Sequence, residues 1–335
     1  MPLVQASHLV KTFDTEQSPF GMRPAGTVRA VNDVSLSIES GETLGLVGES
    51  GSGKSTLALT ILRVLPPAAQ IVAGSMMFEN EDLVRKSDNE MRHVRGKRIA
   101  MILQDPMASL NPLFTIGDQV AEPIRVHEGS RRAVAWQRAK DLLKAVRIPS
   151  PETRVTQHPH EMSGGMRQRI VGAIGISCEP RLLIADEPTT SLDLTIQAQY
   201  LALLRDLQRE HGLALIFITH NLGIVARMCD QLAVMYAGRV VEYGPVSRIF
   251  NAPAHPYTEA LLNSIPRMSD SRKRLTAIEG QPPDLSALPR GCAFAPRCPA
   301  AFDRCHKETP PEFNLADGRT ARCWLASASV QRGAA

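Results

Sequence analysis

The feature that most constrains this chain is the stretch Thr43–Leu65, in which a short apolar run enters a glycine-rich loop and an apolar helical segment follows. The loop reads GESGSGKS over Gly48–Ser55 and matches the phosphate-loop pattern of nucleoside triphosphatases without a gap. Glycines let backbone N–H groups turn toward phosphate oxygens, and the N-terminus of the next helix adds positive potential. Lys54 would add a charge to the phosphates, and the hydroxyl of Ser55 could ligate Mg²⁺. The sequence therefore predicts a nucleoside triphosphate site whose helix runs on until Pro66 stops it.

Composition places the chain among ordinary soluble globular proteins. Its 335 residues are enough for one large domain and an appendage, and 43% of them are hydrophobic and 21% charged. The formal net charge is only +4, so the charge balance gives no reason to invoke nucleic acid as a partner. The N-terminal residues lack the pattern of a signal sequence, and no apolar run is long enough to span a membrane. We therefore expect a cytoplasmic protein, which could still be a peripheral membrane subunit.

Short apolar strands alternate with helical stretches along most of the chain, and this alternation predicts an α/β fold with a largely parallel sheet. Each candidate functional residue follows the carboxyl end of a predicted strand, where such sheets bind ligands. The last two strands flank Ala237-Gly238 and should form a hairpin with a tight turn. The predicted strands are Leu3–Phe13, Val28–Ile38, Gly74–Phe78, Arg98–Leu103, Arg181–Ala185, Leu213–Thr219, Gln231–Tyr236 and Arg239–Tyr243.

A second group of functional candidates lies in the middle of the chain. The apolar run Leu182–Ala185 delivers Asp186 and Glu187 at the end of a strand. Asp186 could hold a metal ion through water, and Glu187 could polarise an attacking water molecule. The tripeptide Ser163–Gly165 lies 23 residues before Asp186 and precedes a helical stretch, so it forms another helix N-terminus suited to phosphate. The phosphate loop and this helix N-terminus are two anion-binding elements in one chain, and few protein families are compatible with both.

In order and spacing these motifs resemble those of the ABC-transporter ATPase family, over about residues 1–250. The signature departs from the usual family pattern, because Met162 and Met166 replace a leucine and a glutamine, but its serine and both glycines remain. A methionine in the fifth place followed by Arg167 is typical of peptide importers. The resemblance implies that ATP is bound by the phosphate loop and the residue after it, namely Gly48, Glu49, Ser50, Gly51, Ser52, Gly53, Lys54, Ser55 and Thr56.

The resemblance also implies roles for residues outside the phosphate loop. Glu187 would be the general base, while His220 as the switch histidine and Gln104 of the Q-loop would sense the γ-phosphate and the metal. Phe13 would stack on adenine, and Ser191–Asp193 would be the D-loop. The Mg²⁺ ligands would be Ser55, Gln104 and Asp186. The residues that contact the ATP bound by another subunit would be Ser163, Gly164 and Gly165.

The fold that this family implies is an α/β ABC ATPase with a RecA-like phosphate-loop core. An antiparallel β subdomain and an inserted helical signature subdomain, at about residues 105–177, would complete it. We therefore expect an ATP-binding domain at residues 1–250 and a small C-terminal extension at residues 251–335.

Four of the six cysteines lie in this C-terminal extension, at Cys292, Cys298, Cys305 and Cys323. Clustered cysteines in a reducing compartment favour a metal or an iron–sulfur cluster over disulfides. The close cysteine pair that is common in structural zinc sites is absent, but zinc and unligated thiols both remain alternatives. The extension resembles that of the oligopeptide/dipeptide importer ATPases, which implies a [4Fe-4S] cluster on these four residues.

The resemblance implies an ATPase that energises the uptake of di- or oligopeptides from the cytoplasmic face of the membrane. A nickel or glutathione importer of the same group is an alternative, as is a soluble ABC ATPase of DNA repair or of ribosomes. A pure interaction module is disfavoured, because every residue needed for hydrolysis is present. The implied partners are a second ABC ATPase subunit, identical or paralogous, two membrane permease subunits and a substrate-binding protein, with no nucleic acid.

Overall fold

The computed structural model of the chain describes residues 1–15, 26–66, 68–190, 192–265 and 278–327. The chain forms two compact units, and each takes its residues from separate stretches of sequence. The first unit contains Met1–Ile38, Leu44–Val84 and Thr219–Ala335. The second contains Glu39–Thr43 and Arg85–Ile218. The predicted division into an ATP-binding domain and a C-terminal extension near residue 250 does not coincide with the boundaries of these units, and it stays a prediction.

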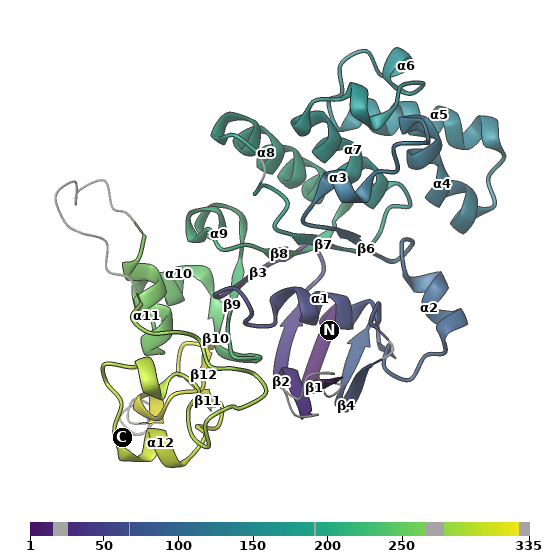
Figure 1. The fold of residues 1–335 in the computed structure, drawn as a ribbon. Coiled ribbons are helices and arrows are strands. Elements are labelled where there is room, and N and C mark those ends of the chain that lie inside the picture. The colour runs from purple at the N-terminus through teal and green to yellow at the C-terminus, as the bar shows by residue number, and fades with distance from the viewer. Residues whose placement is uncertain (16–25, 67, 191, 266–277, 328–335) are drawn as a thin grey trace, which may run out of the picture. The chain divides into compact units, whose positions relative to one another are not determined.

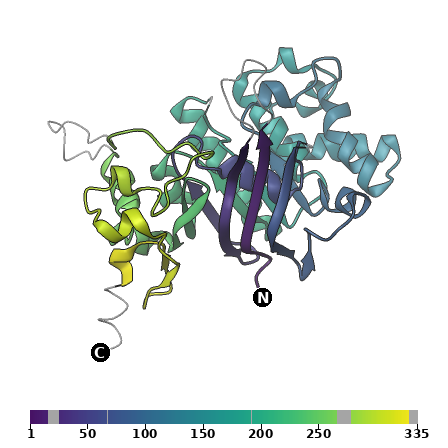
Figure 2. The same cartoon turned by 60° about the horizontal axis from the view of Figure 1, so that its bottom comes forward.

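The first unit carries a four-stranded antiparallel sheet in the order β2-β1-β4-β5 (Figure 2). Its strands are β1 (Val4–Thr15), β2 (Gly26–Ile38), β4 (Ala69–Phe78) and β5 (Glu81–Asp82). The second half of β2 alternates buried and half-buried residues, which is the pattern of a strand with one face on the core. Strands were predicted in the regions of β1, β2 and β4, and all three predictions are confirmed.

The same unit contains a second run of strands, which begins with β3 (Thr43–Val47). From Leu44 onward β3 pairs in parallel with β9 (Gln231–Tyr236), and β9 pairs antiparallel with β10 (Arg239–Pro245). The predicted turn between β9 and β10 is confirmed, with φ angles of 48° at Ala237 and 79° at Gly238. Positive φ at both central residues is what a two-residue hairpin needs to match the twist of its strands.

Helix α1 (Lys54–Ile61) follows the phosphate loop and is shorter than predicted. The sequence suggested that Pro66 stops it, but the helix ends at Ile61 because Arg63 adopts a left-handed φ of 51°. The N–H groups of Arg63 and Val64 then donate to Thr60 O and Leu59 O, at 3.0 Å each. This pair of bonds is a Schellman motif, which satisfies carbonyl groups at the helix end before any proline is reached.

The C-terminal extension continues the first unit and begins with short helices after β10 (Figure 1). Its two short strands pair with each other, and β12 also pairs with β10. The remaining helices and strands of the unit are α9 (Leu222–Met228), α10 (Val246–Asn251), α11 (Pro256–Asn263), the 3₁₀ turn η3 (Ala295–Arg297), α12 (Asp303–Lys307), β11 (Phe313–Asn314) and β12 (Thr320–Ala321).

A fully buried carboxylate joins β10 to the extension. Glu242 has 0% side-chain exposure and accepts hydrogen bonds from the N–H groups of Ala254 at 2.8 Å and His255 at 3.0 Å. The guanidinium of Arg319 lies 3.3 Å from the same carboxylate. Gly244 makes room for that arginine, because a Cβ atom there would lie 2.5 Å from Arg319 Cγ. The extension is therefore anchored on β10 by a buried ion pair.

The second unit is built on three parallel strands, β6 (Ile99–Ile102), β7 (Leu182–Asp186) and β8 (Ala214–Ile218). Every residue of β7 and β8 is buried, as the continuous apolar runs predicted. A helix, α8 (Leu194–His211), follows β7. Asp193 caps its first turn by accepting from Thr195 N and Ile196 N, at 3.0 Å each, and Gly212 ends it with a left-handed φ of 60°.

Helices α4, α5 and α7 of this unit pack on one another and lie together in Figure 1. Residues from Ile116 to Ser177 are thus mainly helical. None of the described helices of the chain is long and apolar enough to cross a membrane. The helices of the second unit are α2 (Asp88–Val94), α3 (Pro106–Ser109), α4 (Ile116–Glu128), α5 (Arg132–Ala145), α6 (Pro151–Arg154), the 3₁₀ turn η1 (Pro159–Glu161), α7 (Gly164–Ile176) and α8 (Leu194–His211).

The anchor at Glu242 yields a stability prediction. Glu242→Ala should lower the free energy of unfolding of the first unit by about 3–5 kcal/mol, because it removes the acceptor of two backbone N–H groups and leaves the buried Arg319 guanidinium with Asp317 as its remaining carboxylate partner. Asp303→Ala is the control, since Asp303 pairs with Lys307 in solvent and should cost less than about 1 kcal/mol. Urea unfolding followed by circular dichroism measures both. Equal midpoints for the two variants would contradict the anchor.

Candidate functional site

The phosphate loop packs closely on the strands beside it. Gly48 has a φ of 153°, and a Cβ atom there would lie 2.2 Å from Met235 O. Gly53 has a φ of 102°, and its Cβ atom would lie 2.4 Å from Ala30 O. Both distances are too short for any side chain. The glycines at these two positions therefore allow the loop backbone to lie against β9 and β2.

The ammonium group of Lys54 lies within this loop. It donates to Gly48 O at 2.8 Å and Glu49 O at 2.9 Å, and it lies 3.5 Å from Ser52 Oγ. Lys54 is only 7% exposed, so the loop carbonyls hold a largely buried charge in place. Ser55 lies next to it, exposed in the first turn of α1. This arrangement presents a cation and a hydroxyl at one helix N-terminus.

His220 shares a cavity with the start of the phosphate loop. The cavity has a volume of about 390 Å³, and its walls come from the end of β3, the start of α9 and one face of α11. His220 is exposed and follows the segment that contains β8. The lining residues are Val47, Gly48, Glu49, His220, Asn221, Leu222, Leu261, Ser264 and Ile265. The predicted switch histidine and the start of the phosphate loop thus line one cavity, within the first unit.

The second unit fixes the carboxylate of Glu187. This carboxylate accepts hydrogen bonds from Gln104 Nε2 at 3.1 Å and Thr190 Oγ1 at 3.0 Å. The backbone of Glu187 has a φ of 44°, which non-glycine residues rarely adopt, and its N–H donates to Ile218 O at 2.9 Å. Asp186 precedes it as the last, buried residue of β7. The structure therefore brings Gln104 and Glu187 into contact and adds Thr190, which the sequence did not single out.

The predicted signature forms the N-terminus of α7. Ser163 Oγ caps the helix by accepting from Met166 N at 3.3 Å, and Ser163 and Gly164 are both exposed. A Cβ atom on Gly165 would lie 2.7 Å from Ile196 Cγ2, so the glycine lets α7 approach α8. Ser163, Gly164 and Gly165 line a cavity of about 480 Å³. Leu192 and Asp193 of the predicted D-loop line the same cavity, whereas Ser191 lies outside the described residues.

Phe13 lies on β1, opposite Val28 of β2, and is half-buried. The ammonium of Lys11 lies 4.0 Å from the centroid of its ring, which is cation–π distance. Burial lowers the pKa of Lys11 to about 8. The ring is thus already in contact with a cation, and its stacking on adenine stays a prediction.

All four cysteines of the extension line one cavity, together with the aromatic residues Phe294 and Trp324. The structure describes all four as free thiols. Burial raises the pKa of Cys292, Cys298 and Cys323, the last to about 11, and neighbouring thiols raise each further. Among the described residues, no three histidine, cysteine or acidic side chains are arranged to hold a metal ion. The structure thus gathers the predicted ligands without showing a metal site.

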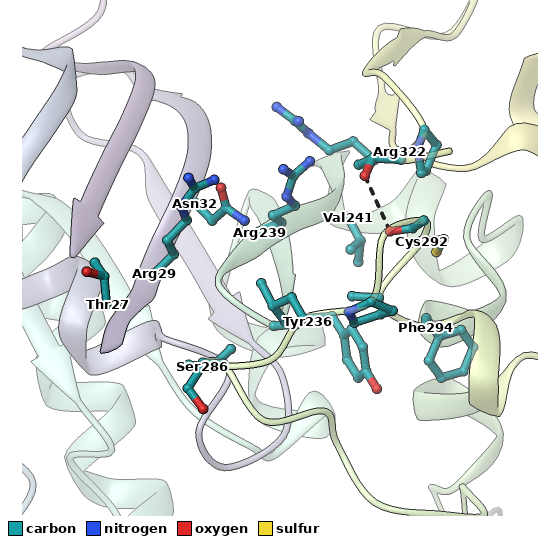
Figure 3. A pocket seen from close by; sticks show the side chains of 18 residues that line it. Thr27, Arg29, Asn32, Tyr236, Arg239, Val241, Ser286, Cys292, Phe294 and Arg322 are labelled. Atoms are coloured by element: carbon teal, nitrogen blue, oxygen red, sulfur yellow. Dashed lines mark hydrogen bonds between the residues drawn. The ribbon is translucent and has the colours of Figure 1, made fainter. Parts of the chain in front are cut away.

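A fourth cavity, of about 320 Å³, lies where the extension meets β2 and the β9–β10 hairpin (Figure 3). Arg29, Arg239 and Arg322 give it positive charge, while Tyr236 and Phe294 line its apolar side. Burial and the neighbouring Arg322 lower the pKa of Arg239. Arg322 also donates to the backbone oxygen of Asp33 on β2 at 2.9 Å. The extension is therefore packed on β2 and the β9–β10 hairpin by charged as well as apolar contacts.

Two residues near the phosphate loop were missed as functional candidates. Arg297 and Tyr257, both in the extension, bind the loop residue Glu49. No local pattern in the sequence points to these contacts, because 248 residues separate Arg297 from Glu49. In this region the sequence singled out the cysteines beside Arg297 and not the arginine.

Family models match two parts of the chain. Residues 31–190 match the ABC transporter model, and residues 241–305 match the model of the oligopeptide/dipeptide transporter C-terminal region. The first match contains the phosphate loop and the signature. The second contains three of the four clustered cysteines and Arg297.

Several curated proteins are similar to this chain over nearly its whole length. The dipeptide transport ATP-binding protein DppD of Escherichia coli is 46% identical over 323 residues, 96% of each chain. Its namesake in Bacillus subtilis is 48% identical over 301 residues, 90% of each chain. Among solved structures, the dimeric ATP-binding cassette MJ0796 with ADP and Pi matches 72% of this chain and 98% of its own, with a TM-score of 0.63 and 24% identity. That likeness supports the fold alone.

The contact of Gly48 with Met235 O predicts how the loop tolerates substitution. Gly48→Ala should weaken MgATP binding at least about tenfold, because its Cβ atom meets a backbone carbonyl that cannot move alone. Gly51→Ala is the control: its φ of 78° costs strain of about 1–2 kcal/mol, but no atom lies within 4 Å of the new Cβ. Fluorescent nucleotide titration compares the two, and a larger loss in Gly51→Ala would contradict the steric explanation.

Proposed function

This chain belongs to the ABC transporter ATP-binding proteins, in the oligopeptide/dipeptide group, and from that premise we propose which residues bind and hydrolyse ATP. Identity of 46–48% over 90–96% of two dipeptide transport proteins carries the assignment. The match of the extension to the peptide-transporter C-terminal region supports it independently of the ATPase core. The chain is the ATP-hydrolysing subunit of a peptide importer, and hydrolysis drives transport.

The first unit binds the triphosphate. Backbone N–H groups of the phosphate loop and the ammonium of Lys54 would hold the phosphate oxygens, and the loop glycines keep side chains out of the way. His220, which shares a cavity with Gly48, would contact the γ-phosphate. Phe13 would stack on the adenine ring from the four-stranded sheet.

The second unit supplies the general base. Glu187 would accept a proton from the attacking water, and hydrogen bonds from Gln104 and Thr190 support this role because they orient its carboxylate. Oxygen ligands of the kind that Mg²⁺ prefers are available from Ser55, Gln104 and Asp186. When bound, Mg²⁺ neutralises negative charge on the phosphate oxygens. Catalysis then depends mainly on positioning and electrostatics.

The signature residues would act on the ATP bound by a second subunit. Ser163 and Gly164 are exposed at the N-terminus of α7, and this helix end favours an anion. The cavity beside them also contains Asp193 of the D-loop. A head-to-tail pair of ATPase subunits, identical or paralogous, would join each phosphate loop to the partner's signature.

The membrane subunits would dock on the second unit, beyond β6. Large apolar side chains are exposed there, with 48% of Leu103, 81% of Leu113 and 54% of Phe114 accessible. Exposed apolar residues so close in sequence favour an interaction surface. We place the chain at the cytoplasmic face of the membrane, on two permease subunits that receive peptide from a substrate-binding protein.

Di- or oligopeptides are the proposed cargo, in preference to nickel or glutathione. The names of the similar proteins support this choice, since both DppD proteins are dipeptide transport subunits. Uptake of peptides of graded length by cells that lack this chain tests the cargo. Nickel or glutathione uptake that falls while peptide uptake is unchanged would contradict it.

The four cysteines of the extension line one cavity, where their thiols could hold one shared group. A [4Fe-4S] cluster is held by four cysteine thiolates, and its iron atoms would lower the thiol pKa values that burial raises. We therefore propose Cys292, Cys298, Cys305 and Cys323 as cluster ligands.

The role of Glu187 as general base predicts a separation of binding from hydrolysis. Glu187→Gln should reduce ATP hydrolysis at least about 100-fold, because the amide cannot accept the proton, while ATP binding is retained and the ATP-bound dimer accumulates. Glu210→Gln is the matched control on the exposed face of α8. Phosphate release and size-exclusion chromatography measure both effects. Normal hydrolysis by Glu187→Gln would contradict the assignment.

The cluster proposal predicts colour and iron content. Full-length protein purified without oxygen should be brown and contain iron, and Cys298→Ser should lose both because it removes a ligand. Cys178→Ser, at a buried cysteine outside the extension, should keep them. Visible absorbance and elemental analysis distinguish the alternatives. A colourless protein that contains zinc, or no metal at all, would contradict the proposal.

A further inference from the structure

A buried arginine of the extension, Arg297, contacts the phosphate loop. Arg297 donates from Nη1 to Glu49 Oε2 at 2.7 Å and from Nη2 to Glu49 Oε1 at 2.9 Å. The side chain of Arg297 is 5% exposed and that of Glu49 is 25% exposed. Two parallel hydrogen bonds between a guanidinium and a carboxylate fix both distance and orientation. This ion pair lies within the first unit.

Every N–H donor of the Arg297 guanidinium has an acceptor. Besides the two bonds to Glu49, Nε donates to Glu279 O at 2.9 Å, and the remaining donors reach Tyr236 Oη at 3.2 Å and Ile278 O at 3.3 Å. A guanidinium has five such donors in a rigid plane. A lysine or any shorter cation could satisfy only part of this set. The site is therefore built for arginine.

Glu49 contacts both the extension and Lys54, the lysine proposed to bind phosphate. Its backbone N–H donates to Tyr257 Oη at 2.9 Å, and its backbone carbonyl accepts from Lys54 Nζ at 2.9 Å. Its carboxylate is held by Arg297 at the same time. All three polar groups of this residue are thus engaged. One loop residue connects the extension to the ammonium that binds phosphate.

Aromatic rings support the two extension residues that hold Glu49. Tyr236 and Tyr257 pack with their ring centroids 4.6 Å apart, and Phe294 lies 5.3 Å from each. The guanidinium carbon of Arg297 lies 5.9 Å from the centroid of Tyr236 and 6.0 Å from that of Phe294. These contacts restrict the positions of the Tyr257 hydroxyl and the arginine plane.

Arg297 lies in the cysteine-rich segment of the extension. It ends the 3₁₀ turn η3, and its N–H donates to Phe294 O at 2.9 Å. The backbone carbonyl of Cys292 accepts from Ala295 N at 3.0 Å at the start of this turn, and Cys298 follows the arginine directly.

We propose that Arg297 and Tyr257 are positioning residues for the phosphate loop, through which the C-terminal extension sets the affinity for MgATP. The inference rests on the proposed role of the loop in binding ATP. Its physical basis is twofold. The bonds to Glu49 fix the backbone carbonyl that holds Lys54, and Arg297 neutralises a carboxylate that would otherwise repel the triphosphate.

The first experiment measures MgATP affinity of full-length variants by fluorescent nucleotide titration. Arg297→Met should weaken binding roughly tenfold, because it frees the loop and leaves Glu49 charged. Arg297→Lys should recover only part of the loss, since it restores charge without the paired bonds. The double variant E49Q/R297M should bind more tightly than R297M alone, because it removes the uncompensated carboxylate. Unchanged affinity in Arg297→Met would overturn the proposal.

Two controls separate this proposal from the proposed function and from loss of folding. Arg304→Met removes an arginine of the same extension that is 52% exposed, and it should leave affinity unchanged. Lys54→Ala should abolish binding. If Lys54→Ala abolishes binding and Arg297→Met does not change it, only the positioning role fails. If the parent chain does not bind ATP, both proposals fail.

A second readout follows the loop without relying on nucleotide. Amide hydrogen exchange of a peptide that contains Glu49 should be faster in Tyr257→Phe, which lacks the oxygen that accepts the Glu49 N–H. The phenylalanine keeps the ring packing, so the fold of the extension is preserved. Faster exchange in the loop with unchanged exchange in β12 supports the proposal. Unchanged exchange in the loop would overturn the role of Tyr257.

Discussion

The nucleotide site depends on how tightly the phosphate-loop backbone lies against its neighbours. Gly48 touches a carbonyl of β9 and Gly53 touches one of β2, so the loop takes its shape from two strands that are far apart in sequence. A loop that is fixed in this way can hold the charge of Lys54 on its own carbonyl oxygens. The cost of burying that charge is offset by the hydrogen bonds that the ammonium makes.

The same constraint explains why the extension belongs to the site. Residues of the extension contact the loop through Glu49 and its partner Arg297. The extension is held in turn by the buried pair of Glu242 with Arg319 and by the contact of Arg322 with Asp33. A cysteine-rich appendage is thereby part of the packed unit that carries the phosphate loop, although the family motifs of the ATPase core do not include it.

Much of this organisation could be predicted from sequence, where the physical signal is local. The all-apolar strands β7 and β8 follow from continuous buried runs, and the β9–β10 turn follows from Ala237-Gly238. The end of α1 could not be predicted, because Arg63 adopts the left-handed conformation that ends the helix. Glycine usually takes this position, so an arginine there does not indicate a helix end. The pairs of Glu49 with Arg297 and of Asp33 with Arg322 span 248 and 289 residues, and no short pattern encodes such contacts.

The order of residues in the first unit has a consequence for synthesis of the protein. The phosphate loop leaves the ribosome early, whereas the arginine that neutralises Glu49 is added 248 residues later. Until then the loop has its lysine and glycines but carries an unbalanced carboxylate. Nascent chains and truncated products that lack Arg297 are therefore expected to bind nucleotide more weakly than the full-length chain.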